Sequence, residues 1–221
     1  MGKLIEINLS ALGNDFGTIE SYNTLRTNLL YTENLKVITI TSTLPDEGKT
    51  VSAFNLAKSF TEIGKKVLLI DGDLRKSSLK KYLSVKGVVP GLSEALTKQA
   101  SDIINSTNIK NLDVIFSGKT PPNPSELLSS KIFGAFIDKL KGVYDYIIID
   151  TPPVNIAIDS VIIGRISDGT VMVVRNDFVK RSEIKRAKVQ LERNDVRIIG
   201  ILLNRVKKTQ VDYKNYVYKY Y

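Results

Sequence analysis

Short apolar runs of strand length recur along the chain and restrict its fold more than any other feature. Most are continuous rather than alternating, which is the pattern of strands buried on both faces of a parallel sheet. Helical patterns separate them at 50–63, 125–141 and 179–194. The predicted strands are 36–42, 66–71, 111–116, 144–150, 170–175 and 197–203. This alternation predicts an α/β fold with a doubly wound, mostly parallel sheet.

The first predicted strand leads into a phosphate-binding loop. Residues 43–50 read Thr-Leu-Pro-Asp-Glu-Gly-Lys-Thr, a P-loop in which Thr43 replaces the usual first glycine. Loop N–H groups and the start of the next helix can receive phosphates, with Lys49 on the β- and γ-phosphates and the Thr50 hydroxyl on Mg²⁺. We therefore expect an ATP site. Its residues are Pro45, Asp46, Glu47, Gly48, Lys49, Thr50 and Val51.

Asp46 is unusual in such a loop because a carboxylate repels a triphosphate unless it is paired or turned outward. Aspartate tolerates a left-handed backbone better than most residues, and Pro45-Asp46 can make a turn. We expect Asp46→Gly to leave nucleotide affinity unchanged or to improve it.

Three acids follow or end two other predicted strands. Asp71 and Asp73 come two residues apart, so an extended chain points them to the same side. Asp150 ends the strand at 144–150, where open α/β sheets bind ligands and where a Walker B carboxylate holds Mg²⁺. A lone acid at a strand end is usually a cap, but three near one P-loop indicate function. We expect Mg²⁺ to be held by Thr50, Asp71 and Asp150.

Composition narrows the chemistry further. With no cysteine and no histidine, thiolate nucleophiles, zinc–sulfur sites and imidazole bases are excluded. Catalysis would rest on carboxylates, lysines, hydroxyls and hard cations. The formal charge of +9 suggests an anionic partner or simply a basic solvated surface. No aromatic–basic RNA-binding signature is present, so no nucleic acid partner is expected.

Half of the tyrosines lie at the end of the chain. They are Tyr213, Tyr216, Tyr218, Tyr220 and Tyr221, five of the 10 tyrosines. This segment lacks a regular apolar period, which predicts a mobile tail. We interpret the phenols as phosphoryl acceptors, with Asp71 or Asp73 as the available base. The alternatives are an aromatic edge strand and a segment docked on a partner.

Together these features resemble the bacterial BY-kinases, in particular the cytoplasmic kinases of capsular or exopolysaccharide export systems. The P-loop at 42–50, the acidic motif at 67–75, the Walker B run at 146–153 and the tyrosine cluster carry the resemblance, and the loop at 118–128 also looks typical. The resemblance implies a fold of the partitioning and septum-site ATPase type. It also implies Mg²⁺·ATP and phosphoryl transfer to tyrosines of a neighbouring subunit. The implied catalytic residues are Lys49, Asp71, Asp73 and Asp150.

The resemblance further implies partners. Members form rings, here through a helix that carries Glu20 and Arg26, although Asn23 replaces an arginine that the family tends to have between them. A membrane-bound activator of the polysaccharide co-polymerase type would recruit the chain to the inner face of the cell membrane, and other proteins are possible substrates. The apolar runs are strand-sized and the N-terminus lacks a signal-peptide pattern, so we expect a cytoplasmic chain.

The expected organisation has three parts: an N-terminal helical extension at 1–35, a P-loop kinase domain at 36–206 and a tyrosine-rich tail at 207–221. Asn204, at the end of the last predicted strand, could meet the adenine edge or cap a turn. Two other functions stay open. One is a partitioning-type switch ATPase, although the P-loop lacks the extra lysine of many such proteins. The other is a non-catalytic ATP-binding regulator of an export complex.

Overall fold

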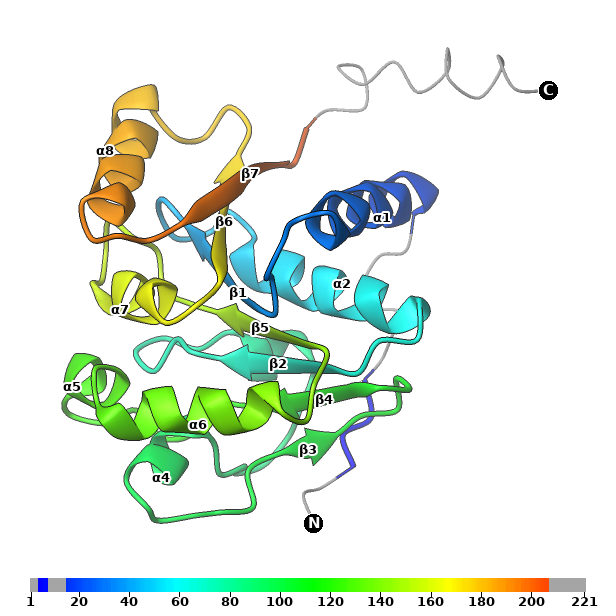
Figure 1. The fold of residues 1–221 in the computed structure, drawn as a ribbon, viewed down its shortest axis with the longest axis vertical. Helices are drawn as coiled ribbons and strands as arrows, with labels where there is room; N and C mark the ends of the chain where they lie inside the picture. Colours follow the sequence, from blue (N-terminus) through cyan, green and yellow to red (C-terminus); the bar gives the residue numbers. More distant parts are fainter. Residues whose placement is uncertain (1–3, 8–14, 207–221) are drawn as a thin grey trace.

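A single seven-stranded sheet organises the molecule (Figure 1). The computed structural model describes residues 4–7 and 15–206. The strand order is β3-β4-β2-β5-β1-β6-β7, and every neighbouring pair is parallel except β3 and β4. The strands are β1 (Val37–Ser42), β2 (Val67–Asp71), β3 (Asn105–Ser106), β4 (Leu112–Ile115), β5 (Tyr146–Asp150), β6 (Gly169–Arg175) and β7 (Ile198–Asn204). The predicted doubly wound, mostly parallel α/β fold is confirmed.

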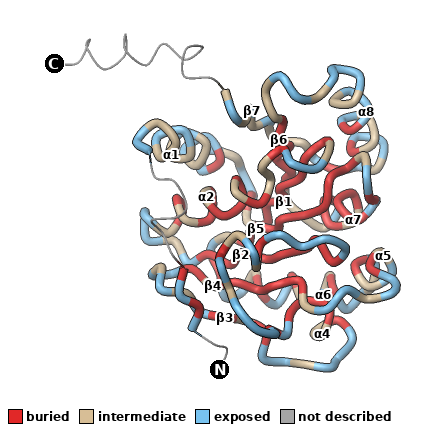
Figure 2. The backbone as a smooth tube through the Cα atoms, turned by 180° about the vertical axis from the view of Figure 1, so that it is seen from behind, coloured by how far each residue is buried: buried red, intermediate tan, exposed pale blue. Residues whose placement is uncertain are grey.

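Helices cover both faces of this sheet, as its continuous apolar strands require. They are α1 (Phe16–Leu30), α2 (Lys49–Glu62), α3 (Leu79–Tyr82), α4 (Leu92–Leu96), α5 (Pro124–Leu128), α6 (Lys131–Lys141), α7 (Asp159–Arg165) and α8 (Arg181–Glu192). Successive residues of β2 serve opposite faces: Leu69 packs with α2, whereas Leu68 and Ile70 pack with α6. The central strands are buried along their length, and exposure concentrates on outer helix faces and loops (Figure 2).

The N-terminal helix α1 lies alongside α2, the helix that follows the P-loop (Figure 1). Its Asp15 caps it by accepting the Thr18 N–H at 3.2 Å. The Tyr22 hydroxyl donates to Ser52 Oγ at 3.2 Å, and Arg26 Nη1 donates to the Ser59 carbonyl at 2.6 Å. The helix is therefore fastened to the body of the fold through α2.

One predicted element was wrong in extent. The predicted helix at 125–141 is two helices, because Ser130 N-caps α6 by accepting the Phe133 N–H at 3.3 Å. The short helices α3, α4 and α7 and the two-residue β3 were not predicted, since each is too short to show a period. Of the described helices, none has the length and apolar character to cross a bilayer.

Strand register brings the acids together. In the pairing of β2 with β5, Asp71 and Asp150 are directly opposite each other. In the pairing of β1 with β5, Ile40 is opposite Asp150, so β1 runs on past it into the P-loop. Because these strands are parallel, their carboxyl ends meet at one edge of the sheet. The five tail tyrosines at 213–221 lie outside the described residues.

Candidate active site

The P-loop turns sharply into α2 at Gly48. This residue has φ 93° and stands at the N-cap of α2. A Cβ there would come within 2.1 Å of Asn204 Nδ2. Asn204 Nδ2 also donates to the Glu47 carbonyl at 2.8 Å. Asn204 thus packs directly on the P-loop, a contact that the sequence did not predict, and its adenine role stays a prediction.

The two acids of the loop lie differently. Asp46 is exposed and has φ 62°, the left-handed conformation that aspartate tolerates. Glu47 is fully buried: its Oε1 accepts the Leu44 N–H at 2.5 Å and its Oε2 accepts the Arg175 N–H at 2.9 Å. The Glu47 carboxylate therefore fastens the loop to the end of β6. Only the backbone of Glu47 is then left to face a phosphate.

Lys49 lies among the three predicted acids. Its Nζ is 3.6 Å from Asp73 Oδ2 and 3.7 Å from Asp150 Oδ1. The Thr50 hydroxyl donates to Asp150 Oδ2 at 2.5 Å. Asp71, Asp73 and Asp150 are all buried, with at most 4% of each exposed. The structure thus brings together the four predicted catalytic residues at the start of α2.

Two serines that the sequence did not single out complete this cluster. The Ser77 hydroxyl donates to Asp71 Oδ2, and Ser78 Oγ lies 2.9 Å from Thr50 Oγ1. Asp73 Oδ1 accepts the Lys76 N–H at 2.9 Å. The turn after β2 therefore wraps its backbone and hydroxyls around the acids. Only its closeness in sequence to Asp71 could have pointed to this turn.

An ion pair between exposed Arg75 and buried Asp159 anchors the same turn from outside. Arg75 Nε donates to Asp159 Oδ2 at 2.7 Å, and Arg75 Nη2 donates to Asp159 Oδ1 at 3.1 Å. The Ser125 hydroxyl donates to Asp159 Oδ1 at 2.6 Å. Asp159 is fully buried at the start of α7, and Ser125 belongs to α5. Asp159 was missed because 84 residues separate it from Arg75.

Burial and mutual repulsion raise the pKa values of Asp71 and Asp150. Burial, followed by the Asp150 charge, raises the pKa of Asp71 to about 7, although the Ser77 hydrogen bond opposes the change. Burial also raises the pKa of Asp150, against the opposing Lys49 charge. Burial alone would lower the pKa of Lys49. The charges of Asp150, Asp73 and Asp71 outweigh the effect of burial, so this pKa is raised. The site is therefore a compact, strongly coupled set of ionisable groups.

The residues present fit a magnesium ion held largely by a nucleotide. The buried Asp150 Oδ1 accepts no hydrogen bond, and the Thr50 hydroxyl is beside it. Within the described ranges, no three acids gather closely enough to form a metal cage by themselves. Mg²⁺ in phosphoryl-transfer sites usually takes one or two carboxylates from the protein and keeps waters and phosphate oxygens as its other ligands.

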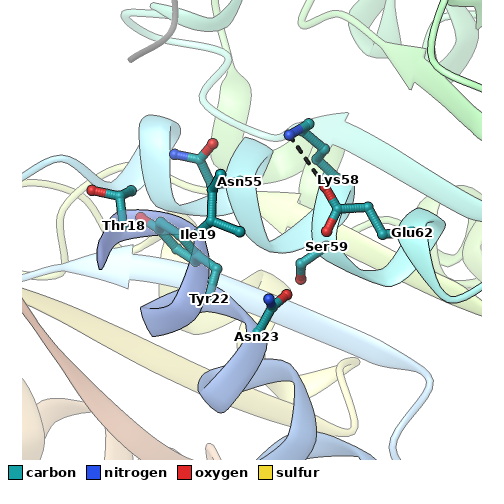
Figure 3. A pocket seen from close by; sticks show the side chains of 8 residues that line it. All are labelled: Thr18, Ile19, Tyr22, Asn23, Asn55, Lys58, Ser59 and Glu62. Carbon is teal, nitrogen blue, oxygen red and sulfur yellow. Dashed lines mark ion pairs between the residues drawn. The ribbon is translucent and has the colours of Figure 1, made fainter. Parts of the chain in front are cut away.

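A small pocket elsewhere does not belong to this site. It lies between α1 and α2 (Figure 3) and includes Tyr22, Asn23, Asn55 and Lys58 in its lining. It is next to the middle and end of α2, whereas Lys49 begins that helix. In the same region Glu20 Oε1 accepts a hydrogen bond from Asn23 Nδ2 at 3.0 Å. The predicted oligomerisation residues Glu20 and Arg26 thus make contacts within their own chain.

Known proteins match this chain along most of its length. A family model described as an AAA domain matches residues 35–179. A Streptococcus agalactiae protein named tyrosine-protein kinase CpsD is 39% identical over 203 residues, which cover 90% of this chain and 88% of that protein. A Bacillus subtilis protein named tyrosine-protein kinase YwqD is 38% identical over 207 residues, covering 91% and 85%.

Solved structures agree. The kinase domain of the Escherichia coli tyrosine kinase ETK superposes with a TM-score of 0.78 at 30% identity, covering 86% of this chain and 78% of that one. The septum-site-determining protein MinD of Pyrococcus horikoshii, in complex with Mg-ADP, gives a TM-score of 0.66 at 25% identity, covering 80% and 72%. The fold is shared by both groups, and the likeness to the kinase is the stronger of the two.

Proposed function

This chain belongs to the bacterial tyrosine-protein kinases, and from that membership we propose that it uses Mg²⁺·ATP to phosphorylate the tyrosines of its own C-terminal tail in trans. The acceptors are Tyr213, Tyr216, Tyr218, Tyr220 and Tyr221. The observation that carries the proposal is the position of Lys49, at the start of the P-loop helix and 3.6–3.7 Å from Asp73 and Asp150.

In the proposed reaction the tyrosine phenol attacks the γ-phosphorus of ATP. A P–O bond to the phenolic oxygen forms, the bond between the γ-phosphorus and the bridging oxygen breaks, and ADP leaves with the electron pair. The phenolic proton passes to the Asp71–Asp73 pair.

The remaining side chains hold and orient the nucleotide. Lys49 neutralises the β- and γ-phosphates, and the loop N–H groups around Gly48 receive them. Mg²⁺, when bound, would be held by Thr50, Asp150 and Asp71, and it offsets the negative charge on the phosphate oxygens. Because Ser77 donates to Asp71 and Ser78 contacts Thr50, these ligands are already oriented by their neighbours.

Site variants test the role assignment. Lys49→Met should abolish tail labelling, and Asp71→Asn or Asp73→Asn should lower its rate by at least about 10²-fold, the scale of acid–base catalysis. The measurement is phosphate incorporation into tail peptides from labelled ATP, with nucleotide binding followed separately by a fluorescent analogue. Asp138→Asn is the matched control, because Asp138 is an exposed carboxylate of α6. Near-normal labelling by either active-site aspartate variant rejects that assignment.

We further propose an assembly for this activity. The 1–35 extension would join copies into a homo-oligomeric ring through Glu20 and Arg26, with Arg26 exchanging its Ser59 contact for an acid of the neighbour. A membrane-bound activator would recruit the chain from the cytoplasm to the inner face of the membrane, in the service of capsular or exopolysaccharide synthesis. Sedimentation of the chain against its Arg26→Gln variant tests the ring. Equal oligomer size in both would reject the role of Arg26.

A further inference from the structure

The turn that wraps the catalytic acids continues into a strongly basic surface. Between Asp73 and Glu94 the chain contains no acidic residue and five cationic ones. All five fall within residues 75–86, here called the basic segment: Arg75, Lys76, Lys80, Lys81 and Lys86. Such a density of one sign beside a reaction centre indicates an anionic ligand.

The basic segment is held firmly against the site. Its Lys76 N–H donates to Asp73, and Ser78 contacts Thr50. Leu79 and Leu83 are buried in the core and anchor α3. The segment therefore begins beside the acids and is held to the fold by its buried leucines.

Its lysines are available to a ligand. Lys76, Lys81 and Lys86 are exposed. Within the described part of the chain, none of these three has an acidic partner at ion-pair distance, whereas Arg75 is committed to Asp159. Unpaired surface cations of this kind suit phosphate groups, which accept several charge-assisted hydrogen bonds.

We propose that the basic segment binds the phosphorylated tail, so that the product of one transfer stays beside the site for the next. The inference rests on the proposed function, because it takes the tail as the phosphoryl acceptor. Residues 207–221 contain four lysines and one aspartate, so the unmodified tail is repelled by the segment. Each phosphotyrosine adds a charge of about −1.5 to −2. About two phosphates therefore cancel the excess positive charge of the tail, and further phosphates make the tail negative.

The geometry allows this contact. The described chain continues to Val206, just beyond β7, and β7 lies four positions from β2 in the sheet. At about 4.8 Å per strand this is roughly 19 Å. Tyr213 comes seven residues after Val206, which extended chain spans with up to about 24 Å. A tail from the same chain can therefore span the distance from β7 to β2, after which the basic segment begins.

The test measures binding without catalysis. A labelled peptide of residues 209–221, synthesised with phosphate on Tyr216, Tyr218 and Tyr220, is titrated by fluorescence anisotropy with the full chain. Saturating Mg²⁺·ADP keeps the peptide phosphates out of the P-loop. The comparison is a triple variant, Lys76→Gln, Lys81→Gln and Lys86→Gln. The control loses the same charge at exposed lysines elsewhere: Lys110→Gln, Lys139→Gln and Lys185→Gln.

The wild-type chain should bind the phosphopeptide at least about tenfold more tightly than the unmodified peptide, and added salt should weaken the binding. The triple variant should lose about eightfold, from roughly twofold per exposed charge pair. The control should change less than about twofold. Equal binding by the triple variant and the control overturns the proposal.

Membrane binding is the competing role for the basic segment, and vesicles test it. If vesicles containing phosphatidylserine sediment the wild-type chain but not the triple variant, and phosphopeptide is not preferred, the segment binds membranes and the proposal is wrong. Because the peptide is phosphorylated chemically, its binding does not depend on whether the chain can transfer phosphate to its own tail. Failure of the binding test is thus distinct from failure of the kinase assignment.

Discussion

At the scale of single residues, Asp46 is the clearest departure from the usual chemistry of a phosphate-binding loop. It places a negative charge among N–H groups that receive phosphates, and it does so with φ 62°. The side chain is exposed, so water screens its charge, and its carboxylate does not line the buried acid cluster. We therefore expect the Asp46 carboxylate to be dispensable for holding a nucleotide.

The variant Asp46→Gly should keep or raise the affinity for Mg²⁺·ADP, because glycine adopts positive φ without strain and a repulsive charge is removed. Asp46→Ala removes the same charge but keeps a Cβ at φ 62°, and it should lower the free energy of unfolding by about 1 kcal/mol. Calorimetric titration and denaturant melts measure the two effects. A clear loss of affinity in Asp46→Gly would mean that its carboxylate has a positive role.

Glu94 links charge to stability at a second position. Burial alone would raise its pKa, but the Gly91 and Lys119 N–H groups that donate to the carboxylate, at 2.8 and 3.1 Å, outweigh burial and lower it below 4.5. A carboxyl whose pKa is lower in the folded than in the unfolded state stabilises the fold at pH values above the unfolded-state pKa. This stabilisation is lost as the pH falls through the folded-state pKa. The contribution is therefore complete at neutral pH.

Glu94→Gln should destabilise the chain by about 1 kcal/mol at pH 7, the usual size for replacing a charged acceptor by a neutral one. The deficit should shrink as the pH drops below 4.5, where the wild-type carboxyl itself becomes neutral. Urea unfolding from pH 7 down to pH 4 or lower measures it, with the exposed Glu33→Gln as control. A deficit that does not vary with pH would show that the Glu94 charge is not its cause.

At the scale of elements, the sequence predicted the long strands and helices with a repeating apolar pattern. It missed the shortest elements and the contacts between residues far apart in the chain. The apolar runs were sufficient to locate the strands, because a short continuous apolar run is typical of a strand buried on both faces. Each long strand begins and ends within about two residues of its prediction. The convergence of Asp71 and Asp150 followed from the rule that parallel strands end at one edge. No such rule connects Arg75 to Asp159 across the sheet edge.

That ion pair joins three elements and should act on catalysis through position. Arg75 connects the turn after β2 to α5 and α7, and its N–H donates to Asp73 at 3.2 Å. Lysine cannot form the two-pronged contact with Asp159. Arg75→Lys should lower kcat about tenfold through misplacement of Asp73, with the KM for ATP little changed.

The measurement is steady-state phosphorylation of a tail peptide, and Arg165→Lys, an exposed arginine on α7, is the matched control. If Arg75→Lys changes only the KM for ATP, or if both variants change equally, the turn is not positioned by this ion pair.

At the scale of the whole molecule, different parts of the fold have different proposed roles. The strands β1, β2 and β5 bring Lys49 and three acids to one edge, where the P-loop helix begins. Helix α1 is fastened to α2 by Tyr22 and Arg26, so a displacement of α1 would be passed on to the helix that starts at Lys49. Beyond β7 the chain continues into the tyrosine-rich residues on which the proposed reaction acts.

The measurement that tests the central claim most directly is the intact mass of the purified chain before and after incubation with Mg²⁺·ATP. We predict steps of about 80 Da, one per phosphate, that map to residues 213–221, disappear on phosphatase treatment and are absent from Lys49→Met. Should the isolated chain stay unmodified, the incubation is repeated with the cytoplasmic segment of a membrane activator. Conversion of ATP to ADP with no mass added to the tail, even then, would contradict the kinase assignment and favour a switch ATPase.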